Sequence, residues 1–295
     1  MLINTLVWGA AFIAVKPSLS VTTPIRYLLY RYLFAVILSL PILWHYLSKL
    51  KEKRIKIKKL IFPIIWIELL GTTLILWMIY EGLKFTSAIE ANLLTMTLPL
   101  FTILAGVYLL KEKQEHHENL GLVVAIFGTL LLTIYPAWKN GTMLQLTSLQ
   151  GNFLILAAML LSGIYYIAAK KYYAGIPKFF ITTLSFYVGL ISFAILAFLE
   201  TPSIDAINRV SSDLQHPSVW IAAGYMALFG SIIGLTAYYQ GQESIEASEA
   251  SLFTYLQPAV AIPLGILLLG ETIYPAQLIA LGLIIIGVFV AEQRV

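Results

Sequence analysis

Tyr80-Glu81-Gly82 is followed 159 residues later by Tyr239-Gln240-Gly241, and this register runs without a gap from Gly71–Gly128 to Gly230–Gly287. At about 20 residues per apolar span, five spans fit within that period. Because five is odd, a segment that enters a bilayer from one face in the first copy enters from the opposite face in the second. Such inverted repeats are typical of secondary carriers, whose substrate site lies at the repeat interface near mid-membrane. The identical pairs are Tyr80/Tyr239, Gly82/Gly241, Ala88/Ala247, Glu90/Glu249, Thr95/Thr254, Pro99/Pro258, Gly106/Gly265 and Glu112/Glu271.

The composition indicates an integral membrane protein. The chain is 59% hydrophobic and 12% charged, with a mean hydropathy of +0.85, which is more apolar surface than one water-soluble core can bury. No apolar segment alternates with a period of two residues, so the spans are expected to be helices rather than barrel strands. Cysteine is absent, which excludes disulfides and thiolate metal sites.

Apolar segments predict an all-α protein with ten transmembrane helices around a central cavity. The first five form a repeat over residues 1–137, and the other five form the inverted repeat over 138–295. The first span lacks a basic leader and a small-residue cleavage site, so we expect a retained helix rather than a signal peptide. The expected helices are 2–17, 24–46, 61–84, 87–110, 118–137, 151–172, 178–200, 218–241, 247–269 and 272–292.

Basic residues are concentrated on one side of these helices. The linker 48–59 carries seven lysines and arginines, and Lys111, Lys113, Lys170 and Lys171 fall in loops on the same side. The positive-inside rule then places both termini and the linker in the cytoplasm of a cell carrying this protein in its cytoplasmic membrane. As a juxtamembrane loop, the linker is interpreted as a topology signal that contacts lipid headgroups rather than nucleic acid.

Two prolines at matching depth, Pro99 and Pro258, predict interrupted helices in the fourth and ninth spans. A proline removes the bond to the carbonyl four residues earlier, and broken bonding is tolerated at membrane depth where protein or a wet cavity satisfies it. Polar residues share a face with each proline. We expect these faces to line the cavity, the alternative being helix packing with a kink. The two faces comprise Asn92, Thr95 and Pro99, and Ser251, Thr254, Tyr255 and Pro258.

Charged residues inside the spans are candidates for coupling, because burying one at the bilayer centre costs at least about 2.5–3.5 kcal/mol. Arg31 lies in the second span, and Glu68 and Glu81 lie in the third. Glu81 has the non-titratable counterpart Gln240, which suggests a proton-sensitive role in one repeat only. Its alternative is an ion pair with Lys84 or Arg31. Glu68 lacks a visible partner at its depth, so it is expected to be protonated or to face water.

Three aromatic residues stand apart from the many that are expected to face lipid. Trp8 adjoins the small residues of the first span, and Tyr80 and Tyr239 are matched by the repeat beside glycines. We include them in the predicted cavity, although they could pack as interfacial anchors.

Ser87-Ala88-Ile89-Glu90 is typical of a capping box, with the Glu90 carboxylate reaching back to the cap amide. The four histidines have no metal spacing, and no nucleotide or hydrolytic motif is present, so no cofactor is expected.

Several motifs resemble the drug/metabolite transporter superfamily, and specifically its EamA-type ten-helix exporters. The motifs are Leu6–Lys16 (LVWGAAFIAVK), Arg31–Ala35 (RYLFA), Thr86–Ala88 (TSA), Leu252–Pro258 (LFTYLQP) and Leu268–Glu271 (LLGE). The resemblance implies a cavity lined by helices 1, 3, 4, 6, 8 and 9, and export of amino acids, their analogues or other small metabolites. It also implies roles for the matching residues Trp8, Lys16, Arg31, Thr95, Thr254 and Tyr255. Gln257 stands where such sequences commonly have Glu, which argues against carboxylate coupling at that position.

Together these features predict a carrier that alternates access and moves a small amphiphilic metabolite, with protons as a candidate coupling ion. Moderate cavity polarity suits amino acids or related zwitterions better than multiply charged phosphates, which need a cluster of basic residues. A membrane-embedded enzyme would need a convergent His, Asp or Ser constellation at membrane depth. A receptor or scaffold would not require paired interrupted helices.

The charge asymmetry makes a testable prediction about orientation. In this chain without cysteines, a single Cys at Lys56 should be protected from a membrane-impermeant thiol reagent in intact cells and should react after permeabilisation. A Cys in the 138–149 segment serves as the exposed control. Labelling at position 56 in sealed cells would contradict the predicted topology.

Overall fold

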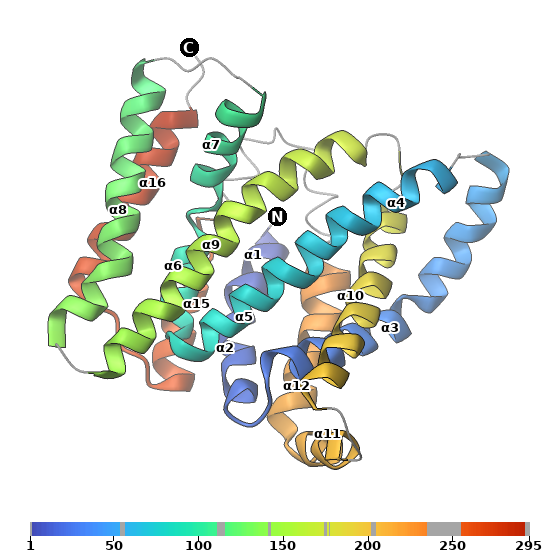
Figure 1. The fold of residues 1–295 in the computed structure, drawn as a ribbon. Helices are drawn as coiled ribbons and strands as arrows, with labels where there is room; N and C mark the ends of the chain where they lie inside the picture. Colours follow the sequence, from blue (N-terminus) through green and yellow to red (C-terminus); the bar gives the residue numbers. More distant parts are fainter. Residues whose placement is uncertain are drawn as a thin grey trace.

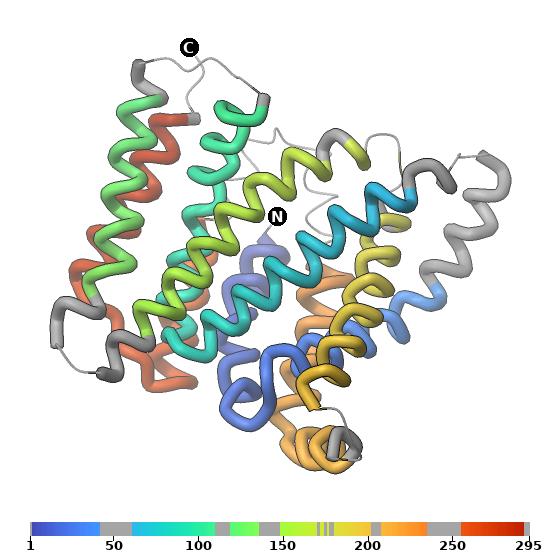
Figure 2. The backbone as a smooth tube through the Cα atoms, in the orientation of Figure 1, coloured from blue at the N-terminus to red at the C-terminus, as the bar shows by residue number. Residues whose placement is uncertain are grey.

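The computed structural model describes residues 2–53, 57–110, 116–140, 143–173, 176, 178–201, 205–234 and 255–292, and every regular element among them is a helix (Figures 1 and 2). In chain order these are α1 (Leu2–Gly9), α2 (Ala11–Val15), the 3-10 helix η1 (Lys16–Ser20), α3 (Pro24–Lys53), α4 (Ile57–Glu68), the π-helix η2 (Leu69–Ile75), α5 (Leu76–Phe85), α6 (Ala88–Thr95), α7 (Leu98–Leu110), α8 (His116–Asn140), α9 (Met143–Tyr172), α10 (Lys178–Glu200), α11 (Asp205–Gln215), α12 (Pro217–Tyr225), the π-helix η3 (Met226–Ile233), α15 (Pro258–Leu269) and α16 (Pro275–Glu292).

Several of these helices are suited to crossing a membrane, which confirms the all-α membrane fold. Five stretches are both long and apolar enough: Leu2–Ser20, Ile61–Phe85, Ala88–Leu109, Ser148–Ala169 and Phe180–Glu200. Large apolar side chains also point outward, including Phe62 at 66% and Leu267 at 78% exposure, as contact with lipid requires. The total of ten spans stays a prediction.

The fourth span is interrupted beside Pro99, as its position predicted, and α15 begins at Pro258 after a turn, while the part of the ninth span before residue 255 lies outside the described residues. α6 ends at Thr95 and α7 begins at Leu98, while a turn at 255–257 leads directly into α15 at Pro258. The amide of Met96 donates to the Leu93 carbonyl at 3.1 Å, a tightened bond to the third preceding residue. The two turns coincide when 159 residues are added to the first, as the proposed repeat requires.

The two π-helices were not anticipated, and they too occupy corresponding places. η2 ends at Ile75 and η3 at Ile233, which is 158 residues later. In a π-helix the amide bonds to the fifth preceding carbonyl, which widens the helix and often marks a functional site. The sequence predicted unbroken helices over 61–84 and 218–241, because apolar periodicity does not distinguish an α-turn from a π-turn.

Close packing of α8 against α16 follows a two-fold pattern (Figure 1). A Cβ on Gly121 would lie 2.5 Å from the Gly287 carbonyl oxygen, and one on Gly128 would lie 2.9 Å from the Ala280 carbonyl oxygen. With the repeat period of 159 residues, Gly121 corresponds to Ala280 and Gly287 corresponds to Gly128. The first pair is therefore the repeat equivalent of the second. An interface that pairs equivalent residues in this way is what two-fold-related repeats would form, and it supports the proposed repeat.

The predicted loops 138–149 and 201–217 are corrected by the structure. α8 continues to Asn140, and α9 begins at Met143. Residues 205–215 form α11. Its segment Asn208–Gln215 is bent by 82° from the helical stretch Pro217–Ile233. Val210 of α11 packs against the core. The apolar spacing of Ile207, Val210 and Leu214 fits one helical face, and it was the sequence signal for this element.

The ends of the helices separate into two sides (Figure 1). The C-terminal ends of α7 and α16 lie toward the upper side of the view, whereas η1 and α11 lie toward the lower side. The connections that the sequence assigned to the basic side include residues outside the described part of the chain, and their position in the cytoplasm stays a prediction.

The α8–α16 interface can be tested with one pair of glycines on the same helix. In Gly287→Ala the new Cβ would lie 2.4 Å from the Ala125 backbone nitrogen, so overpacking should cost about 1–3 kcal/mol and lower the melting temperature in detergent. Gly282→Ala is the matched control, because a Cβ there meets nothing within 4 Å. Equal melting temperatures for the two variants would contradict the interface.

Candidate functional site

Arg31 of α3 lies where elements from both halves of the chain meet. It shares a helical face with Tyr27 and Ala35, which are fully buried, so the side chain points into the protein. Its Nη1 donates to the Tyr80 hydroxyl of α5 at 3.0 Å, and its Nη2 donates to the Ser231 hydroxyl of η3 at 3.3 Å. The Arg31 guanidinium therefore connects α3, α5 and η3.

The positive charge of Arg31 is not neutralised by a carboxylate in the described part of the chain. Its partners there are two neutral hydroxyls and the rings of Tyr32 and Tyr80, whose centroids lie 5.7 and 6.0 Å from the guanidinium carbon. Its Nε is buried without a hydrogen-bond partner. A guanidinium at membrane depth is costly unless an anion pairs with it. The planar donors of Arg31 are suited to bind the carboxylate of a small molecule.

Aromatic rings pack against the ring of Tyr80, whose hydroxyl Arg31 contacts. The Tyr80 side chain is 2% exposed, and its ring meets the edges of Tyr27 and Phe12 at centroid distances of 5.2 and 6.4 Å. Tyr27 belongs to α3 and Phe12 to α2. The first helical segment, the second span and the third span therefore contribute to one aromatic cluster around Arg31.

Asn92 has a polar side chain whose hydrogen-bonding capacity is unused. It is 1% exposed, and neither its amide nitrogen nor its carbonyl oxygen has a hydrogen-bond partner in the described chain. Thr95 instead donates to the Asn92 main-chain carbonyl at 2.7 Å. Buried polar atoms are normally paired, so an unpaired amide indicates a site for water or a ligand.

Pro99 is half-buried near the start of α7.

The second polar face is only partly described. Tyr255 packs against the core, and Pro258 is buried at the first position of α15. Tyr239, Gln240, Ser251 and Thr254 lie outside the described residues. Their places in the proposed cavity stay predictions.

Lys16 and Trp8 both satisfy backbone carbonyls at irregular helix positions. The Lys16 ammonium donates to the carbonyls of Leu83 and Thr86, each at 2.5 Å, at the C-terminal end of α5. The Trp8 indole nitrogen donates to the Gly230 carbonyl of η3 at 3.0 Å. A cation at a helix C-terminus is favourable because the free carbonyls carry partial negative charge. The geometry thus gives each residue a structural role.

The two acidic candidates occupy different environments. Glu81 forms an ion pair with Lys84 at 3.7 Å, and their side chains are 23% and 42% exposed. This is one of the two ion pairs that the sequence offered as an alternative to coupling. Glu68 is fully buried at the end of α4, where its Oε1 accepts hydrogen bonds from Tyr165 and Tyr173.

The expected capping box at the start of α6 is half correct. Ser87 accepts a hydrogen bond from the Glu90 amide at 3.0 Å, but the Glu90 carboxylate accepts from the side chains of Thr86 and Gln277 rather than reaching back to the cap amide. Glu271 occupies this helix end instead, accepting from the amides of Ala88 and Ile89 at 2.6 and 2.8 Å.

The backbone at the end of α15 explains how Glu271 reaches α6. Gly270 has a φ of 65°, a left-handed conformation that glycine adopts without strain. The Gly270 amide then donates to the Ile266 carbonyl, the bond of the αL capping motif, and the Glu271 amide donates to the Gly265 carbonyl. The Gly-Glu pair thus ends one helix and caps another, a role that sequence reasoning missed.

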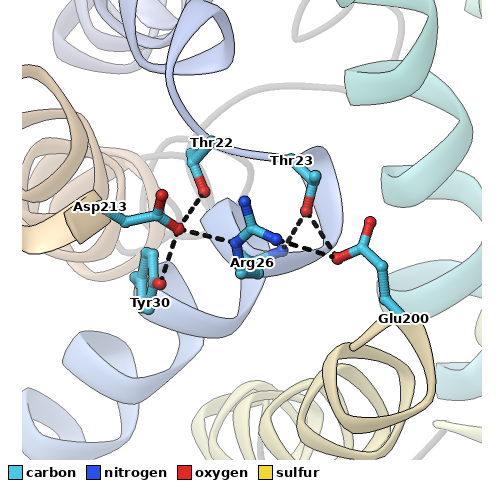
Figure 3. Close-up of polar contacts among 6 residues, drawn as sticks. All are labelled: Thr22, Thr23, Arg26, Tyr30, Glu200 and Asp213. Atoms are coloured by element: carbon cyan, nitrogen blue, oxygen red, sulfur yellow. Dashed lines mark hydrogen bonds and ion pairs between the residues drawn. The ribbon is translucent and has the colours of Figure 1, made fainter. Parts of the chain in front are cut away.

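A second polar cluster, also missed, ties α11 to α3 (Figure 3). Asp213 of α11 is 4% exposed and accepts from Arg26 Nε at 2.7 Å, from Thr22 at 2.6 Å and from Tyr30 at 2.9 Å. Arg26 also lies 3.6 Å from Glu200 at the end of α10. The sequence signal was a pair of opposite charges, Arg26 and Glu200, at the predicted outer ends of two spans, whereas Asp213 gave none because it fell in the predicted loop 201–217. Among the described residues, no group of three or more His, Asp or Glu could hold a metal ion.

The helical fold and apolar surface define a multi-pass membrane protein, and comparison with known sequences gives its class. The EamA-like transporter family matches residues 1–134 and again residues 149–292. The chain belongs to this family, and it is a transporter.

Individual relatives support this membership. The uncharacterized transporters YetK and YcxC of Bacillus subtilis are 26% and 24% identical to it, over 79% and 90% of this chain and 68% and 82% of their own lengths. An uncharacterized transporter of Archaeoglobus fulgidus is 23% identical over 97% of this chain and 95% of its own. One solved crystal structure shares the fold with a TM-score of 0.55 at 17% identity, covering 98% of this chain and 94% of that one.

The Arg26–Asp213 contact should contribute much more to stability than the neighbouring Arg26–Glu200 contact. Asp213→Ala leaves a buried guanidinium and two hydroxyls without their acceptor, which should cost about 3–5 kcal/mol. Glu200→Ala removes a longer contact to a side chain that is 28% exposed and should cost about 0–1 kcal/mol. Thermal unfolding in detergent measures both. Similar melting temperatures would show that α11 is not held by Asp213.

Proposed function

We propose that the protein is a secondary carrier in the cytoplasmic membrane. Its proposed substrate is a small amphiphilic metabolite, an amino acid or a related zwitterion, and its proposed direction is export. It alternates access by rocking one repeat against the other around a site between them. The outward direction rests on the resemblance to EamA-type exporters. Protons are the proposed coupling ion.

The observation that carries this proposal is the guanidinium of Arg31, which lies between the two halves and has no carboxylate partner among the described residues. Tyr80 comes from the first half and Ser231 from the second, and both contact Arg31. A ligand carboxylate bound there would supply the missing negative charge and contact both repeats at once. Movement of one repeat would then change the contacts of the ligand, which is the requirement for a ligand to shift a conformational equilibrium.

The cavity proposal adds a second polar contact. The unpaired Asn92 amide offers two donors and an acceptor among otherwise apolar neighbours, which suits the uncharged polar groups of a small solute. The interruption beside Pro99 follows this residue within two turns. Discontinuous helices in corresponding places of two repeats are the common setting of carrier sites.

Counterflow into proteoliposomes tests the substrate class. Labelled amino acids and nucleosides are offered with and without an imposed pH gradient, and each transported amino acid is competed with its own amide, which lacks the carboxylate. We expect competition by the acid and weak competition by the amide. Arg31→Gln should abolish this preference, whereas Arg31→Lys should retain part of it because the charge remains without the bidentate geometry. Equal competition in the wild-type protein would contradict the carboxylate assignment.

The cavity itself is tested by steric block. Thr95→Trp should prevent transport without unfolding the protein, since the half-buried Thr95 side chain would project a large ring toward the proposed path. Thr254→Trp is the repeat-related variant, at a position outside the described residues. Detergent melting temperature and monodispersity verify that each variant folds. Transport at the wild-type rate by both variants would move the cavity elsewhere.

A further inference from the structure

Glu68 is the most completely buried carboxyl group in the described part of the membrane spans. It is the last residue of α4 and is 0% exposed. The π-helix η2 begins with the next residue, Leu69. An ionised carboxylate at such a place needs a cation or a full set of hydrogen bonds, because no water compensates its charge.

The hydrogen bonds to Glu68 leave one oxygen unused. Tyr165 of α9 donates to Oε1 at 3.3 Å, and Tyr173, the residue after the end of α9, donates to the same atom. Within the described residues, Oε2 has no hydrogen-bond partner. Ser185 of α10 lies near the carboxyl group, but its hydroxyl donates to the Ile181 carbonyl at 2.8 Å. One occupied oxygen and one free oxygen suit a carboxyl group that carries a proton on Oε2.

Among the described residues, the ionisable groups facing Glu68 are tyrosines. Tyr165 approaches from α9, Tyr173 from the residue after its end, and Tyr32 from α3. No ion pair joins Glu68 to a Lys, Arg or His of the described chain. Within the described residues only the hydroxyl donors Tyr165 and Tyr173 favour the charged form of Glu68, and no cation neutralises it, in contrast to Glu81, which is paired with Lys84.

The contact of Tyr165 with η2 depends on a glycine in that helix. A Cβ on Gly71 of η2 would lie 2.2 Å from the Tyr165 ring, so the absence of a side chain there lets the ring reach the helix that carries Glu68. Gly71 lies in the wide π-turn directly after Glu68. A change between π and α geometry in η2 would alter both the ring contact and the position of the carboxyl group.

A short series of contacts connects Glu68 with the proposed substrate site. The Arg31 guanidinium lies over the Tyr32 ring, and the Tyr32 hydroxyl donates to the Thr72 carbonyl at 3.3 Å. The Thr72 hydroxyl donates to the main-chain carbonyl of Glu68 at 2.6 Å. Movement of η2 would therefore change the surroundings of both Arg31 and Glu68. Such a shared change is a physical basis for coupling proton binding to ligand binding.

We propose that Glu68, rather than Glu81, is the proton-binding residue of this transporter. It takes up a proton on Oε2 from one side of the membrane and releases it to the other side when the repeats exchange access, and no other bond forms or breaks. The inference rests on the proposed carrier function. It assigns coupling to the buried carboxyl group and leaves Glu81 as part of an interfacial ion pair.

Two measurements test this assignment with Glu81→Gln as the matched variant on the same span. In proteoliposomes, Glu68→Gln should keep counterflow exchange and lose the extra accumulation that an imposed pH gradient gives, whereas Glu81→Gln should retain it. Full gradient-driven accumulation by Glu68→Gln would overturn the proposal. Its loss in Glu81→Gln alone would assign coupling to Glu81.

Infrared difference spectroscopy of the purified protein provides a readout that requires no transport. A pH titration of the wild type should show the carbonyl stretch of a protonated acid in a dry environment, absent from Glu68→Gln and shifted in Tyr173→Phe, which removes one hydroxyl donor while preserving the ring. An unchanged band in Glu68→Gln would overturn the proposal even if that variant did not transport. If the wild type exchanged no solute, the carrier function would fail, while the infrared titration would still decide whether Glu68 binds a proton.

Discussion

Hydrocarbon offers no hydrogen bonds, and this constraint governs how the interrupted helices of this protein are completed. Each break exposes backbone groups that the chain must satisfy from another element. Lys16 donates to the carbonyls at the end of α5, Glu271 accepts from the amides at the start of α6, and Trp8 donates to a carbonyl of η3. The helices can be broken within the protein because distant side chains replace the lost bonds.

These contacts also hold the two halves of the chain together. Glu271 joins the end of α15 to α6, and Trp8 joins α1 to η3, so both cross from one proposed repeat to the other. They add to the close packing of α8 against α16, which also joins the two halves. Unlike that packing, a charged cap at a helix end can be exchanged without separating a packed core.

Buried polar atoms without a hydrogen-bond partner in the described chain include Arg31 Nε, both polar atoms of the Asn92 side chain and Glu68 Oε2. Arg26 Nη1 and the Tyr27 hydroxyl are in the same state, so such atoms alone do not define a site. Arg31, Asn92 and Glu68 were candidates from the sequence, because polar and charged residues are costly inside apolar spans. Lys16 was a candidate on the same footing, and in the structure its ammonium contacts three backbone carbonyls. Sequence cannot separate a residue that caps a helix from one with unused polar atoms, since both place a polar group in an apolar segment.

By itself the sequence determined the membrane class, the family and the interruption beside Pro99, because hydropathy, motif identity and the missing proline amide act locally. Only the tertiary structure decided that Glu271 rather than Glu90 caps α6, that Asp213 anchors α11, and that Glu68 is buried while Glu81 is paired with Lys84. Those outcomes depend on which helices lie side by side. A side chain finds its partner across a distance in sequence that no local pattern records.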